Sequence, residues 1–144
     1  DLHDEAIDLE ENIREAASYL HNYETHIDYD CQSEVDRIIK LALIAICKEA
    51  VSNVIKHSSG NRVDIKLQEQ TGFITLSVAD NGKLYEEDRK KISLGEGSGI
   101  GLENMRERAE SLGGHISFFT DSGFRVFVNL PKKGETADES TDCR

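Results

Sequence analysis

The chain has 144 residues, of which 38% are hydrophobic, and a formal net charge of −11. This length and composition suit one globular domain that folds around its own core. Because no basic stripe is present, nucleic-acid binding is disfavoured. The longest apolar run, Leu41 to Cys47, is too short to cross a bilayer. The three cysteines lack paired metal spacing, which favours reduced thiols in a cytosolic setting.

The negative charge lies mostly at the N-terminus. Residues 1–30 carry a net charge of −9, whereas residues 31–131 carry −1. Apolar side chains recur at helical spacing from residue 1 to about residue 22 and leave a wide acidic face. The pattern predicts a terminal helix that packs on the rest of the chain or on a partner.

The remaining elements predict an α+β fold. Residues 83–98 have no periodicity and predict a mobile loop, and the Gly/Thr/Ser/Asp-rich tail predicts disorder. Helices on one face of a mostly antiparallel, mixed sheet would give a two-layer α/β sandwich. The expected elements are an edge strand at 26–31, a long helix at 33–58 with a capping-box-like Ser33 and Asp36, a hairpin of 62–69 and 73–79, a helix at 102–112, and two strands at 115–120 and 124–130 ended by Pro131.

A glycine-rich run, Gly97-Ser98-Gly99-Ile100-Gly101-Leu102, leads directly into the predicted helix at 102–112. Glycines let the backbone approach a ligand, and the first amides of a helix favour an anion such as phosphate. The run is not a Walker loop, because no Gly-Lys-Ser/Thr follows, and no strand precedes it as in a dinucleotide fingerprint. Taken alone, a run of this kind is more often a tight connection than a nucleotide site.

A polar row interrupts the apolar pattern of the long helix. Glu49, Asn53 and either Lys56 or His57 would lie on one face. A carboxylate beside an amide oxygen suits Mg²⁺, which takes further ligands from phosphates and water. A solvated polar face is the alternative.

Asp80-Asn81-Gly82 follows the second strand of the predicted hairpin. The Asp80 carboxylate could accept a hydrogen bond from an exocyclic amine, and Gly82 would leave room for a flat ring. An ordinary turn has the same sequence signature.

Together these three segments resemble the N, G1 and G2 boxes of the Bergerat-fold ATPases, which include gyrase, Hsp90, histidine kinase and MutL proteins. The segments are Glu49 to His57, Asp80 to Gly82 and Gly97 to Leu102. The Lys56-His57 pair and the continuation Met105 to Ala109 are most similar to bacterial sensor histidine kinases of the nitrate-sensor and desaturase-thermosensor type. Three ordered boxes are specific where each alone is not.

The resemblance implies an ATP- and Mg²⁺-dependent transferase of a two-component signal-transduction system. Asn53 would bind Mg²⁺, Glu49 would act in catalysis with it, and Asp80 would read the adenine amine. Residues 83–98 would be a lid over ATP. The implied nucleotide contacts come from Asn53, Lys56, His57, Asp80, Gly82, Gly97, Gly99, Ile100, Gly101 and Leu102.

The same resemblance implies a catalytic domain within a longer protein. Residues 1–23 would be a helical linker from a dimerisation domain, 24–131 the ATP-binding domain and 132–144 a disordered tail. The γ-phosphoryl group would pass to a histidine on the dimerisation domain and then to a response regulator. His3 is not expected to be this acceptor, because too little chain separates it from Glu49. The parent protein would be a homodimer with this domain in the cytoplasm, and its membrane anchoring stays open.

Two departures from the family pattern affect the site. Leu84 replaces the second glycine of the G1 box, and Gly123-Phe124 stands where relatives often have Gly-Thr. A hydroxyl near the adenine would then be missing, or supplied by Ser122 or water. An anti-sigma-factor-type serine kinase and a non-catalytic nucleotide-binding interaction module are the alternative functions.

Overall fold

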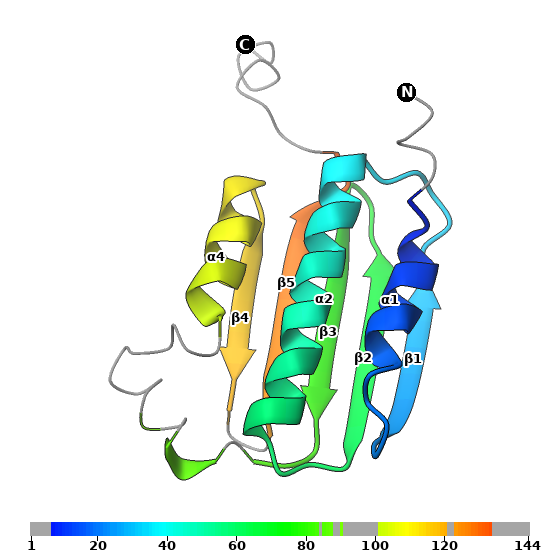
Figure 1. Cartoon of the computed structure of the whole chain (residues 1–144). Coiled ribbons are helices and arrows are strands. Elements are labelled where there is room, and N and C mark those ends of the chain that lie inside the picture. The colour runs from blue at the N-terminus through cyan, green and yellow to red at the C-terminus, as the bar shows by residue number, and fades with distance from the viewer. Residues whose placement is uncertain (1–6, 84, 88–89, 91–100, 121–122, 134–144) are drawn as a thin grey trace.

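The computed structural model describes residues 7–83, 85–87, 90, 101–120 and 123–133. One five-stranded sheet has the order β1-β2-β3-β5-β4, and helices α1, α2 and α4 cover the same face of it (Figure 1). The predicted α+β sandwich is therefore confirmed. Its elements are α1 (Leu9–Ala17), β1 (Glu24–Asp30), α2 (Arg37–His57), β2 (Arg62–Glu69), β3 (Phe73–Asp80), α4 (Leu102–Ser111), β4 (His115–Phe119) and β5 (Arg125–Pro131).

The sheet is mixed but mostly antiparallel. Among the described strands, only β1 and β2 pair in parallel, while β2–β3, β3–β5 and β5–β4 are antiparallel. The parallel pair follows from the long α2 crossover between its strands, whereas the short turn at 70–72 joins β2 and β3 as a hairpin. Both predicted hairpins are present, with strand ends within two residues of the predicted positions.

Buried and exposed side chains alternate along the strands, and the buried ones form the core between the sheet and the helices. In β3 the inward positions are Ile74, Leu76 and Val78, and in β2 they begin with Val63 and Ile65. The register brings these side chains into rows, with Ile65 opposite Val78. Because the period is two, the next inward position of β3 is Asp80, which is buried at the end of the strand.

The predicted capping box of α2 is wrong. The helix begins at Arg37, and its N-cap Asp36 makes no side-chain capping hydrogen bond. Ser33 instead donates its hydroxyl and its amide to the Glu69 carboxylate, at 2.8 and 3.1 Å. Ser33, which the local pattern predicted to cap the helix, thus bonds instead to Glu69, 36 residues away in the sequence.

The N-terminal helix is shorter than the predicted span to residue 22. In the described residues it runs from Leu9 to Ala17, and the Asp8 side chain accepts from the amide of Glu11 at its N-terminus. Its apolar stripe packs on α2 and joins the core, with Ile13 fully buried. The chain then turns so that β1 enters the sheet edge at Glu24, two residues earlier than predicted.

None of the described helices has the length and hydropathy that crossing a bilayer requires. Cys31 and Cys47 are free thiols. Most of the predicted mobile loop at 83–98 lies outside the described residues, as does the tail after residue 133. The division into 1–23, 24–131 and 132–144 stays a prediction.

Candidate functional site

Three segments that are distant in sequence meet at one end of the molecule. The C-terminal ends of α2 and β3 lie at the lower end of the view in Figure 1, and the N-terminus of α4 is the lower end of that helix. These segments contain the three sequence motifs. The fold therefore gathers the predicted polar residues at a common end of the helical layer.

Asp80 is buried at the end of β3, with 7% of its surface exposed. Its Oδ1 accepts hydrogen bonds from the Ser58 hydroxyl at 2.9 Å and from the Gly82 amide at 2.7 Å. Its Oδ2 accepts from the Phe124 amide at 3.3 Å. A buried carboxylate held by three donors is fixed in direction, as a recognition group requires.

Gly82 lies where the backbone of the 58–60 segment passes closest to the end of β3. A Cβ at Gly82 would come within 2.7 Å of the Ser59 carbonyl carbon, so only glycine fits. Next to this contact is a hollow of about 420 Å³ lined by Ser59, Gly60, Asn61, Asn81, Gly82 and Lys83. The position of a Cβ at Gly82 is therefore filled by the backbone of Ser59 and Gly60, while another side of Gly82 lines the hollow.

Glu49 lies against the start of α4. Gly101 is the N-cap of that helix, with a left-handed φ of 72°, and makes no side-chain cap. A Cβ at Gly101 would lie 2.7 Å from the carboxylate carbon of Glu49. The carboxylate from α2 and the first-turn amides of α4 thus lie close together.

Asn53 lies one turn beyond Glu49 on α2 and is 2% exposed. His57, at the end of α2, is half-buried, and its carbonyl accepts a hydrogen bond from the Tyr85 amide at 3.0 Å. The amide oxygen and the carboxylate are hard donors of the kind that Mg²⁺ uses beside phosphate and water. No group of three or more His, Cys, Asp or Glu in the described part of the chain could hold a metal ion.

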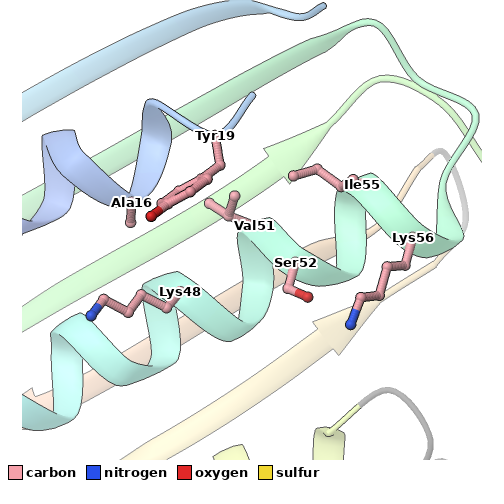
Figure 2. A pocket seen from close by; sticks show the side chains of 7 residues that line it. All are labelled: Ala16, Tyr19, Lys48, Val51, Ser52, Ile55 and Lys56. Atoms are coloured by element: carbon pink, nitrogen blue, oxygen red, sulfur yellow. The ribbon is translucent and has the colours of Figure 1, made fainter. Parts of the chain in front are cut away.

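Lys56 is exposed on α2. Its side chain contributes to a hollow of about 360 Å³ between α1 and α2, and Figure 2 shows its amine pointing away from Tyr19. The hollow is mainly apolar, with Val51 and Ile55 on one side. The contact of Lys56 with phosphate stays a prediction.

The glycine-rich run is described only at its end. Gly97, Gly99 and Ile100, like Leu84, lie outside the described residues. Leu102, the first residue of α4, is buried and belongs to the core. The predicted nucleotide contacts of this run stay predictions.

Two partners of Asp80 were not predicted from the sequence. Ser58 supplies a hydroxyl, and Phe124 supplies an amide while its ring is fully buried. Ser58 places a hydroxyl on Asp80, whereas Ser122, a predicted source of a hydroxyl near the adenine, lies outside the described residues, so that prediction stays untested. One indication of Ser58 was present in the sequence, which is that it directly follows His57, the last residue of the polar motif on α2.

Comparison with known proteins supports the motif-based interpretation. The family described as histidine kinase-, DNA gyrase B- and HSP90-like ATPase matches residues 39–134. Sensor protein VraS of Staphylococcus epidermidis is 38% identical over 104 residues, which are 71% of this chain and 28% of that protein. Sensor protein VraS of Staphylococcus haemolyticus is 37% identical over 111 residues, which are 76% of this chain and 30% of that protein.

Solved structures show the same fold. The catalytic domain of histidine kinase ThkA aligns with a TM-score of 0.69 and 22% identity, over 88% of this chain and 94% of that domain. The histidine kinase domain of a blue-light activated kinase from Erythrobacter litoralis aligns with a TM-score of 0.66 and 16% identity, over 86% of this chain and 59% of that domain. The chain spans less than a third of the length of the curated relatives it matches. It belongs to the histidine kinase-, DNA gyrase B- and HSP90-like ATPase family.

Proposed function

We propose that this domain binds Mg²⁺-ATP at the end of the helical layer and transfers the γ-phosphoryl group to a histidine on a dimerisation domain, for relay to a response regulator. The observation that carries the proposal is the contact between Glu49 and Gly101. It places a carboxylate beside an anion-favouring helix N-terminus, one helical turn from the buried Asn53. The names of the VraS relatives, which are sensor proteins, support the sensor branch over the serine-kinase alternative.

The nucleotide would lie with its base at Asp80 and its phosphates at the start of α4. Asp80 accepts a hydrogen bond from the exocyclic amine of adenine, and Gly82 lets the ring approach the backbone. The first-turn amides after Gly101 donate to phosphate oxygens. Lys56, on the last turn of α2, would add positive charge on the phosphate side beside His57, and Gly97, Gly99 and Ile100 would supply further phosphate contacts.

Asn53 would hold Mg²⁺, with water and phosphate oxygens as its other ligands. When bound there, the metal would neutralise the charge that develops on the transferred phosphoryl group. Glu49 orients the incoming histidine or a water toward the γ-phosphate, and Asn53 keeps the donor set rigid because it is buried. Most of the catalysis is then positioning and electrostatics.

Calorimetry with a non-hydrolysable ATP analogue tests the site. Asp80→Asn replaces an acceptor oxygen by an amide donor and should weaken binding by about 10-fold or more. Asn53→Ala should lose most of the gain in affinity that Mg²⁺ gives to the wild-type protein. Wild-type affinity in Asp80→Asn would exclude base recognition by this residue, and an unchanged Mg²⁺ dependence in Asn53→Ala would exclude the metal role.

Phosphoryl transfer requires the parts of the protein outside this chain. A longer protein containing the dimerisation domain should label a histidine with γ-phosphate in an acid-labile, base-stable form. Glu49→Gln should reduce the labelling rate by roughly 10²-fold or more while nucleotide binding persists. Labelling of serine instead would favour the serine-kinase alternative.

A further inference from the structure

The acceptor capacity of Asp80 is used unevenly by its protein partners. Oδ1 accepts two short hydrogen bonds, from the Ser58 hydroxyl and the Gly82 amide. Within the described residues, Oδ2 accepts only the longer bond from the Phe124 amide, at 3.3 Å. A carboxylate oxygen has about two acceptor sites, so Oδ1 is full and Oδ2 keeps a site for a ligand.

The Ser58 hydroxyl has little freedom to point elsewhere. Ser58 is 3% exposed at the end of α2, and its own amide donates to the Val54 carbonyl. Its oxygen also accepts from the Gly60 amide at 3.3 Å. A hydroxyl has one proton, and these contacts direct it to Oδ1 of Asp80.

We infer that Ser58 is a positioning residue that holds the Asp80 carboxylate so that Oδ2 faces the purine, and that it thereby sets the preference for a 6-amino over a 6-oxo purine. This inference rests on the proposed function, because it takes Asp80 as the group that reads the base. An exocyclic amine donates to Oδ2, whereas an oxo group places a second acceptor against the carboxylate. The torsion about the Cβ–Cγ bond of aspartate is broad, so a carboxylate without Ser58 can turn away from that clash.

The purified chain tests this inference by calorimetry with Mg²⁺ and two probes, a non-hydrolysable ATP analogue and the matching inosine nucleotide. Ser58→Ala should weaken the adenine nucleotide about 10-fold and the inosine nucleotide much less, so the preference falls. Ser58→Thr should keep the preference, and in an Asp80→Asn background Ser58→Ala should cause no further loss. Ser111→Ala is the matched control, because Ser111 is the last residue of α4 and its hydroxyl donates to the Arg108 carbonyl, away from Asp80.

Thermal unfolding of each variant accompanies the titrations. If Ser58→Ala does not fold, Ser58→Thr and Ser58→Val give the same comparison, since the two side chains share a shape and differ in the hydroxyl. An equal loss for both nucleotides in Ser58→Ala, or no loss for either, overturns the positioning role. The proposed function still stands in that case if Asp80→Asn weakens adenine nucleotide binding. Wild-type adenine affinity in Asp80→Asn overturns the proposed base recognition itself.

Discussion

Gly101 connects the two halves of the candidate phosphate site. Its left-handed backbone starts α4, and the missing side chain leaves the space that the Glu49 carboxylate occupies. A side chain at this position would have two separate effects, because it strains the backbone and also displaces Glu49. These effects can be separated, since Gly72 has a similar φ of 82° but a Cβ there would meet no atom within 4 Å.

We expect Gly101→Ala to destabilise the domain by ~1–2 kcal/mol and to weaken nucleotide binding by about 10-fold. Gly72→Ala should cause a similar loss of stability, because the backbone strain is the same, and should leave binding unchanged. Chemical denaturation and calorimetry measure the two quantities. If both variants bind like the wild-type protein, the Glu49–Gly101 contact has no part in the site.

At the level of elements, the buried apolar residues of α1 join this helix to the hydrophobic core of the domain. Ile13 is fully buried in the same core as α2, although residues 1–23 are predicted to be a linker. A linker that packs in this way would make the stability of the domain depend on a segment that lies outside the family match, which begins at residue 39.

Truncating Ile13 tests that dependence. Ile13→Ala removes buried atoms and should lower the free energy of unfolding by ~2–5 kcal/mol. Ile38→Ala removes the same atoms from a side chain that is 53% exposed on α2, so it should change stability by only ~0.5 kcal/mol or less. Urea denaturation measures both, and equal small effects would mean that α1 adds little to the domain.

The elements also show where sequence patterns predict structure well. Alternation located the strands because one face of each is buried, and three ordered motifs identified the family. The start of α2 was not predictable, because Ser33 bonds to Glu69 on another strand. Ser58 and Phe124 were missed for the same reason, since their bonds to Asp80 depend on how α2 and β5 are placed beside β3.

Across the whole molecule, Glu69 ties together segments from three parts of the chain. Its carboxylate accepts from the amides of Gln32 and Ser33, from the Ser33 hydroxyl and from the Lys132 ammonium, which is 3.0 Å away. The Gln32 amide first, then Lys132 and Ser33, lower the pKa of Glu69 to about 2. The backbone of Lys132 also bonds to Asp36 and Gly72, so the contacts lie at the opposite end of the sheet from Asp80.

This lowered pKa predicts an acid-sensitive contribution to stability. The pKa of an unfolded glutamate is about 4.3, so the contribution is fully present above that pH and is lost as pH falls toward 2. Glu69→Gln should therefore be less stable at neutral pH and lose less stability on acidification. Glu110→Gln, which changes an exposed carboxylate on α4, is the control, and parallel pH profiles for all three proteins would contradict the assignment.

The alternation of β3 has a consequence for how this domain can vary in length. Asp80 faces the helices because it is an even number of residues from Ile74, Leu76 and Val78. Inserting or deleting a single residue between Leu76 and Asp80 would turn the carboxylate to the uncovered side of the sheet while the core before it stayed in register. The proposed base recognition would therefore tolerate a change of two residues in this interval but not of one, because only an even change preserves both the packing and the direction of the carboxylate.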